Sequence, residues 1–323
     1  MDVERLIEGV LARDRRAVAR AISLVEDGSP ELEALSAGIY PSTGAAMTIG
    51  LTGAPGVGKS TLAAALVGEA RAREHRVAVL AVDPTSPYTG GALLGDRVRM
   101  QAHATDPDVF IRSMATRGHL GGMALAAPEA IRILDAAGYG LVLVETVGVG
   151  QAEVDVAAAT DTAIVVMAPG LGDAVQLAKA GILEVADVFV ANKADREGAD
   201  EVVRGLRQML HLGEARAWDP PIVPTTATAG EGVGEVWQAV DHHRSWSRGS
   251  GQWEAKRRAR LLREVGSLAA ERFRIAAAGA LAADAPLADE LTGRRIDPYA
   301  AARRLLRDSA PPGSSPAEQG DTA

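Results

Sequence analysis

The sequence predicts an α/β fold, in which a mainly parallel sheet is covered by helices and helical segments precede and follow it. Between residues 47 and 246, seven short stretches that are apolar at nearly every position alternate with stretches of helical periodicity. Strands of this composition are buried on both faces, which is typical of parallel sheets with helices packed against them. The chain has 323 residues, 47% of them hydrophobic, so it is long enough to bury such a core.

Residues 1–46 form the first predicted part, a helical extension. Apolar residues recur three and four positions apart, with Arg and Asp on the opposite face, which is the pattern of about two amphipathic helices. The residues that carry this pattern are Val3, Leu6, Ile7, Val10, Leu11, Val18, Ile22 and Val25.

Residues 47–248 form the second part and hold the predicted strands. The first strand is MTIGLTG, which begins at Met47, and the last is PIVPTTA, which ends at Ala227. Between them lie VAVLAVD, VFIRSM, LVLVETV, TAIVVMAP and DVFVANKAD, in this order. Because the carboxyl ends of parallel strands share one edge of a sheet, we expect a ligand site at that edge.

Residues 249–309 form the third part, a helical arm, and residues 310–323 form a tail whose composition predicts disorder. The arm contains a basic run from Lys256 to Arg263 that a nucleic-acid-binding protein would also show. Apolar residues at helical spacing nevertheless make it an amphipathic helix, and we favour packing or dimerisation. These apolar residues are Leu261, Leu262, Val265, Leu268 and Phe273.

Composition excludes several classes of function. The net charge of -8 argues against a protein that binds nucleic acid through its phosphates, and the absence of cysteine excludes disulfides, thiol nucleophiles and thiolate zinc sites. The amino terminus has no apolar leader and no apolar run reaches about 18 residues, so we expect a cytoplasmic protein that does not enter membranes. His242 and His243 are adjacent and so do not share a helix face as metal ligands; we expect surface histidines.

The first chemical motif is GAPGVGKS, which satisfies G-x-x-x-x-G-K-[ST] and lies between a predicted strand and a predicted helix, the context of a P-loop. Its glycines let successive backbone N–H groups point at one centre, where phosphate binds. Lys59 is expected to reach the outer phosphates and Ser60 to bind Mg²⁺. A glycine-rich turn without a ligand is the weaker alternative. The predicted nucleotide-binding residues here are Gly53, Ala54, Pro55, Gly56, Val57, Gly58, Lys59, Ser60 and Thr61.

A second motif, NKAD, begins at Asn192 and continues through Lys193 to Asp195, directly after a predicted strand. The Asp195 carboxylate can accept from both N1–H and the exocyclic amine of guanine, which adenine does not offer. Taken alone, these residues are also ordinary turn residues. Their position after a P-loop favours GTP and GDP as ligands. Thr226, Ala227 and Thr228 stand where GTPases usually have Ser-Ala beside the base.

The strand LVLVETV ends in Glu145, three residues before Gly148, where most GTPases have Asp-x-x-Gly. We expect Glu145 to lie near Mg²⁺ and the Gly148 N–H to meet the γ-phosphate. The alternative is that Glu145 caps the helix after Gln151. Asp83 ends another strand and Asp96 follows it, so both are expected at the same edge.

Four stretches of the chain resemble the MeaB family of P-loop GTPases, also labelled ArgK, which includes the human methylmalonic aciduria type A protein. They are AVDPTSPYTGGALLGDRVRM, ETVGVGQAEVD, APGLGDAVQLAKAGILEVADVFVANKAD and TAGEGV, and the resemblance runs from about Ala17 to about Ala300. It implies a homodimeric GTPase that escorts an adenosylcobalamin-dependent acyl-CoA mutase, gates cofactor loading, and protects or reactivates the mutase.

The same resemblance implies roles for single residues. By position, Asp83, Asp96 and Glu145 match the acids around magnesium and the switches, and with Lys59 they form the predicted catalytic set. Gln176 and Lys179 fall in a third switch that senses the mutase. The departures from the family pattern are Thr85, Leu171 and Thr226.

Two other functions fit parts of the sequence. A nickel-inserting metallochaperone GTPase has similar switches, but it normally shows a His-rich tract or metal-binding cysteines. A P-loop kinase of a small substrate has no need of the motif at Asn192. Val149 follows Gly148 where many GTPases have a water-orienting Gln, so we expect hydrolysis that is slow alone and stimulated by a partner.

Overall fold

The computed structural model describes residues 2–83, 103, 105–115, 122–146, 151–170, 182–212 and 216–309. Contacts within the chain divide it into two compact units, Met1–Arg263 and Glu264–Ala323. Four predicted site residues lie outside the described part of the chain: Asp96, Gly148, Gln176 and Lys179.

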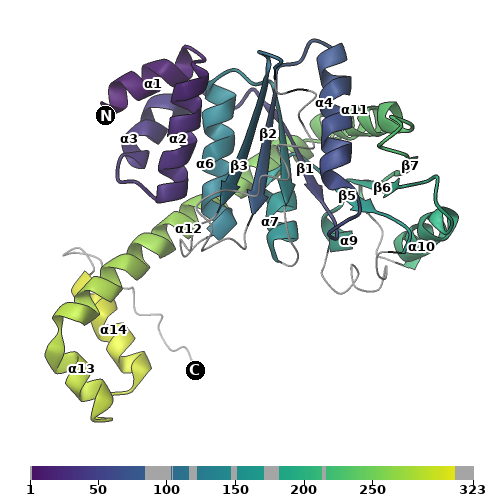
Figure 1. Ribbon diagram of the computed structural model, residues 1–323. Helices are drawn as coiled ribbons and strands as arrows, with labels where there is room; N and C mark the ends of the chain where they lie inside the picture. Colours follow the sequence, from purple (N-terminus) through teal and green to yellow (C-terminus); the bar gives the residue numbers. More distant parts are fainter. Residues whose placement is uncertain are drawn as a thin grey trace. The chain divides into compact units, whose positions relative to one another are not determined.

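A seven-stranded sheet forms the centre of the first unit, and every pair of neighbouring strands is parallel (Figure 1). The strand order is β3-β2-β4-β1-β5-β6-β7. The predicted α/β class and the parallel sheet are therefore confirmed. The strands are β1 (Met47–Thr52), β2 (Val77–Asp83), β3 (Val109–Ala115), β4 (Leu141–Thr146), β5 (Thr162–Met167), β6 (Val188–Asn192) and β7 (Ile222–Thr225).

Strand β1 lies between β4 and β5, and all three strands are buried along their whole length. Their side chains alternate between the two faces, because successive residues of a strand point in opposite directions. Leu141 and Leu143 of β4 belong to the core on one face, whereas Val142 and Val144 belong to the core on the other. This explains why the central strands are apolar at nearly every position.

Helices cover both faces of the sheet (Figure 1). Residues of α4 (Lys59–Ala72) and α11 (Val233–Gly249) share one core with β1, and residues of α6 (Gly122–Ala136) share the other with β2 and β4. Within the part of this region that the structure describes, the other helices are α7 (Gln151–Ala159), α9 (Ile182–Val185) and α10 (Ala199–Leu212). The site at the carboxyl edge therefore rests on a sheet packed on both sides.

The chain begins with three helices rather than the predicted two: α1 (Val3–Leu11), α2 (Arg15–Asp27) and α3 (Leu32–Ile39), followed by η1 (Tyr40–Ser42). The third helix is short, and only Leu35 and Ile39 mark its buried side. Helix α2 packs against α6 and β3, where Arg112 pairs with the buried Glu26 at 2.6 Å. The extension is thus part of the first unit.

Helix α12 (Gln252–Ala283) begins in the first unit and continues into the second, which also holds α13 (Ala285–Thr292) and α14 (Pro298–Ser309). Asp284 caps α13 by accepting from the Leu287 N–H at 3.0 Å, and the Leu287 side chain is fully buried. None of the helices that the structure describes is both long and apolar enough to cross a lipid bilayer.

Candidate nucleotide-binding site

The GAPGVGKS segment forms the loop between β1 and α4, and its three glycines, Gly53, Gly56 and Gly58, all have positive φ angles. Gly53 and Gly58 have φ angles of +135° and +100°, which side chains of L residues rarely adopt. A Cβ atom at Gly53 would lie 2.2 Å from the Val166 carbonyl oxygen, and one at Gly58 would lie 2.3 Å from Asn192 Nδ2. The loop therefore packs closely against β5 and against Asn192, the first residue of the NKAD motif.

Lys59 and Ser60 occupy the first turn of α4. The Lys59 ammonium is buried in the loop and donates to the carbonyls of Gly53 at 2.5 Å and Ala54 at 3.2 Å. The residue before the helix is Gly58, whose lack of a side chain leaves the first N–H groups of α4 directed into the loop. Backbone donors and an ammonium group thus converge where a phosphate would bind.

The Ser60 hydroxyl donates to Glu145 Oε1 at 2.5 Å, which joins α4 to the end of β4. Both residues are buried, and Glu145 is only 1% exposed. Hydroxyl and carboxylate oxygens are the ligands that Mg²⁺ prefers, so this pair fits the ion. Within the described residues, the nearby hydroxyls of Thr52 and Thr146 are buried with no hydrogen-bond partner, so this edge has further polar capacity.

Asp83 is the last residue of β2, and its neighbour Val82 is paired with Thr146 of β4. Its backbone therefore ends at the same edge as Glu145, as the sequence predicts, although the structure does not describe its side chain. Of the predicted magnesium ligands, the structure places the side chains of Ser60 and Glu145 in contact. Asp96, together with Gly148, lies outside the described residues.

Asn192 ends β6 and joins the P-loop to the predicted base loop. Its Nδ2 donates to the Val57 carbonyl at 2.8 Å, and its Oδ1 accepts from the Thr225 hydroxyl at 3.1 Å and the Ala227 N–H at 3.2 Å. The side chain is 3% exposed. We call this set of three bonds the Asn192 junction. It joins the phosphate loop to the base loop through one side chain.

The rest of the base motif lies beside this junction. Lys193 has a φ of +60° and donates from Nζ to the Gly56 carbonyl at 2.7 Å. Asp195 is exposed, so its carboxylate is available to a base. The Thr226 N–H donates to the Glu231 carbonyl at 3.0 Å, which holds the predicted Thr226 to Thr228 segment in a turn. The structure thus brings NKAD, this turn and the P-loop together.

Sequence reasoning missed Thr225, whose hydroxyl holds Asn192, and Glu231, which closes the turn. A signal was available for Thr225, because it is a hydroxyl residue at the end of a strand and directly precedes the predicted base loop. Glu231 lies in the TAGEGV stretch, but its side chain gives no signal of this role, since the bond is made by its backbone carbonyl.

His243 is buried, contrary to the expected surface position, whereas His242 is exposed. His243 lies on the inner side of α11, with Nδ1 at 2.9 Å from the Thr162 hydroxyl and Nε2 at 3.3 Å from Asp187 Oδ1. It repeats the spacing of Val236 and Val240, which face the core. Within the described residues, no group of three or more His, Cys, Asp or Glu side chains is placed to hold a metal ion.

Comparison with known proteins finds relatives that are named as GTPases. The family description "Methylmalonyl Co-A mutase-associated GTPase MeaB" matches residues 18–281. A putative GTPase of Pyrococcus horikoshii is 48% identical over 308 residues, which cover 94% of this chain and 97% of that protein. The Mus musculus protein named methylmalonic aciduria type A homolog, mitochondrial, is 35% identical over 276 residues, or 79% of this chain and 66% of the mouse protein.

A solved structure extends the similarity to the fold. The crystal structure of an LAO/AO transport system kinase has a TM-score of 0.69 and 27% sequence identity, and the match covers 95% of this chain and 97% of that one. The family match, the relatives and the fold all agree with the resemblance seen in the motifs. The chain therefore belongs to the MeaB family of GTPases.

Proposed function

We propose that this protein binds and hydrolyses GTP with Mg²⁺ and serves as a chaperone of an adenosylcobalamin-dependent acyl-CoA mutase. The Asn192 junction carries the nucleotide part, because one buried side chain bonds to the P-loop and to the base loop. The family description, which names a mutase-associated GTPase, supports the partner. Methylmalonyl-CoA mutase or a close relative is the mutase that this description favours.

The nucleotide roles follow from the side chains around the loop. Lys59 would leave the carbonyls of Gly53 and Ala54 to reach the outer phosphates, and the N–H groups of the loop would hold the rest. Ser60 and Glu145 would hold Mg²⁺ together with Asp83 and Asp96. When bound, this ion neutralises charge on the phosphates. Gly148 would contact the γ-phosphate.

Guanine choice is tested by changing Asp195→Asn. The change replaces an acceptor with an amide donor, so we expect GTP affinity to fall about a hundredfold and XTP, which has a carbonyl at C2, to gain affinity. Binding of GTP, ATP and XTP is measured for both forms. Asp200→Asn, the same change at an exposed position of α10, is the control and should bind GTP like the parent. Equal affinity of the parent for ATP and GTP would favour the small-substrate kinase instead.

A homodimer is the second part of the proposal. Apolar residues of α12 remain exposed at the heptad-like spacing of a helix that packs against another helix. Leu262 and Val265, for example, are 64% and 63% exposed. A second copy of α12 would cover this stripe, which consists of Leu261, Leu262, Val265, Leu268 and Ile275. Sedimentation of the parent and of a Val265→Glu, Leu268→Glu variant tests it, and a parent that is monomeric at micromolar concentration contradicts it.

The mutase part is tested by mixing the protein with candidate acyl-CoA mutases and following GTP turnover and cobalamin absorbance. We propose that Gln176 and Lys179 sense the mutase, that hydrolysis is slow without it, and that hydrolysis gates cofactor loading. Lys179→Ala should then bind GTP like the parent but lose the stimulation. If no mutase of the same organism changes turnover or cofactor transfer, the chaperone role is wrong, whereas nickel-dependent turnover would favour the metallochaperone alternative.

A further inference from the structure

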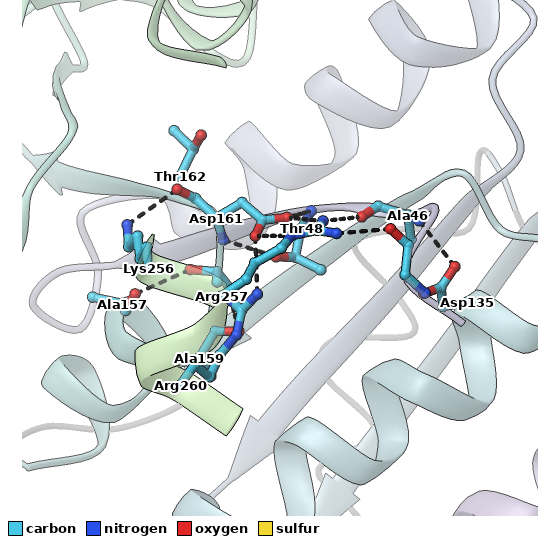
Figure 2. Close-up of polar contacts among 12 residues, drawn as sticks. Ala46, Thr48, Asp135, Ala157, Ala159, Asp161, Thr162, Lys256, Arg257 and Arg260 are labelled. Carbon is cyan, nitrogen blue, oxygen red and sulfur yellow. Dashed lines mark hydrogen bonds and ion pairs between the residues drawn. The ribbon is translucent and has the colours of Figure 1, made fainter. Parts of the chain in front are cut away.

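The amino edge of the sheet, opposite the nucleotide site, holds a second polar cluster (Figure 2). Its centre is Asp161, which directly precedes β5 and is 2% exposed. Its partners are Thr48 of β1 and Lys256, Arg257 and Arg260 of α12. We call these five residues the Asp161 joint. All of them lie in the first unit.

The Asp161 carboxylate is saturated. Oδ1 accepts from Arg257 Nε and Arg260 Nη2, both at 3.0 Å, and Oδ2 accepts from Arg257 Nη2 at 2.8 Å and the Thr48 N–H at 3.0 Å. Burial raises the pKa of Asp161, but the bonds and charges of Arg257 and Arg260 outweigh it, and the net pKa is lowered. The Asp161 N–H also donates to the Thr48 hydroxyl at 2.8 Å. The amino ends of β1 and β5 are thus bonded through one carboxylate.

The cations of α12 bond to more than Asp161. Arg257 donates to the carbonyls of Gly44 and Ala46, both at 2.7 Å, and Arg260 donates to the Ala159 carbonyl at 2.7 Å. Lys256 bridges the Asp161 carbonyl and Asp187 Oδ2, both at 3.0 Å. The beginning of the basic run therefore binds inside this protein, which supports the packing interpretation of that helix.

The segment that enters β1 is held from two sides. Asp135 of α6 accepts from the N–H groups of Gly44 and Ala46, whereas Arg257 binds their carbonyls (Figure 2 shows Asp135 and Ala46). Six residues separate Ala46 from Gly53 at the start of the P-loop. Because β1 is extended and fully buried, a shift at one end displaces the other rather than being absorbed in between.

Strands β1 and β5 are thus clamped together at both ends. At the amino end the clamp is the Asp161 joint, and at the carboxyl end Gly53 lies so close to Val166 that a Cβ would not fit. In the register between them, Ile49 pairs with Thr162 and Thr52 with Val165. A slip of β1 along β5 would therefore move the P-loop relative to the base loop.

We propose that the Asp161 joint makes docking of the first turns of α12 and binding of guanine nucleotide mutually dependent. A bound nucleotide orders the P-loop and so holds β1 in register with β5, which strengthens the Asp161 joint. Because such coupling is reciprocal, an intact joint in turn strengthens nucleotide binding. Arg257 and Arg260 act as positioning residues, since they act through β1. This inference rests on the proposed nucleotide site.

Hydrogen exchange of residues 252–263, measured with and without GDP and Mg²⁺, tests the coupling. We expect GDP to slow this exchange about fivefold or more in the parent, which corresponds to a small allosteric coupling. Arg257→Lys keeps the positive charge but loses the several hydrogen bonds that the guanidinium donates. GDP should then slow the exchange of residues 252–263 by less than about twofold, and GDP affinity should fall by the factor by which this slowing is reduced. Arg260→Gln removes two bonds only and serves as the second variant if the first does not fold.

Arg258→Gln is the matched control, because Arg258 is the exposed neighbour on the same helix. It should keep both the GDP effect and the GDP affinity of the parent. If the parent binds GDP without any change in exchange at 252–263, the coupling is wrong and the nucleotide site stands. If Arg257→Lys and Arg260→Gln lower only the melting temperature, the joint is merely structural. A parent that binds no guanine nucleotide overturns both proposals.

Discussion

The two edges of the central sheet both gather polar side chains, but they differ in whether those side chains use up their hydrogen-bonding capacity. At the amino edge, both oxygens of Asp161 each accept two bonds from the protein. At the carboxyl edge, the hydroxyls of Thr52 and Thr146 have no partner among the described residues, and the first N–H groups of α4 point into a glycine-rich loop. Unused capacity, rather than the number of polar groups, distinguishes a binding site from a structural joint.

The largest effect is expected at the amino edge, where the Asp161 carboxylate is fully hydrogen-bonded. Asp161→Asn leaves the partly buried Arg257 and Arg260 with less charge compensation, and breaking an ion pair whose carboxylate is buried costs about 3–5 kcal/mol of unfolding free energy. Urea unfolding of the variant beside the parent measures the loss, with Asp200→Asn as the control for the same change at an exposed position. A loss below about 1 kcal/mol would show that solvent replaces the joint, as at an exposed pair.

Two carboxylates at the amino edge should make the stability of the protein depend on pH. The pKa values of Asp161 and Asp187 are lowered in the folded state; for Asp187, burial raises the pKa but the bond from His243 and the charge of Lys256 outweigh it. A lowered folded pKa contributes stability that is present above the ordinary value of 3.8 and is lost as pH falls through the folded pKa. Unfolding free energy should therefore fall steeply below about pH 4, and Asp161→Asn should flatten that slope. An equally steep slope in the variant contradicts this assignment.

At the carboxyl edge, a change should act on nucleotide affinity instead. Gly58→Ala places a Cβ 2.3 Å from Asn192 Nδ2 at a φ of +100°, so the Asn192 junction must open. Strain of this size corresponds to a loss of GTP affinity of about a hundredfold. Gly205→Ala, in α10 with open space around it, is the control and should stabilise the protein by up to about 1 kcal/mol. Parent-like GTP binding by Gly58→Ala would mean that the junction does not shape the site.

The smallest effect is expected at His243, whose two partners, Thr162 and Asp187, also lie at the amino edge. His243→Gln removes its bonds to Thr162 and Asp187 in a buried setting, and about 1–2 kcal/mol of unfolding free energy should be lost. Tryptophan fluorescence should also change, because the ring lies 5.1 Å from that of Trp218. His242→Gln, at the exposed neighbour, should stay within about 0.5 kcal/mol of the parent. Equal effects of the two changes would contradict the buried role of His243.

The sequence predicted all seven strands close to their observed ends, because a strand buried on both faces is apolar at each position and stands out from the helices around it. It missed α3, where a short helix has too few turns to show a period, and it placed His243 at the surface. A histidine is a polar residue, so the sequence favours an exposed position for it. Only the packing of α11 against the sheet shows that both ring nitrogens of His243 have partners, Thr162 and Asp187.

Motifs also predicted which residues of the candidate site would come together, since GAPGVGKS and NKAD each follow a strand and parallel strands end at one edge. Their contacts were not predictable in detail. The bond from Asn192 to Val57 joins residues 135 positions apart, and it depends on the order in which β1, β5 and β6 lie in the sheet.

By itself, the sequence determined the α/β class, the parallel sheet and the family, because hydrophobic period and local motifs are properties of neighbouring residues. Only the tertiary structure decided that Asp161, which belongs to no motif, receives Arg257 and Arg260 from almost a hundred residues further on. The physical reason is that a buried carboxylate must be compensated by whichever cations the fold brings to it, and sequence distance carries no information about that pairing.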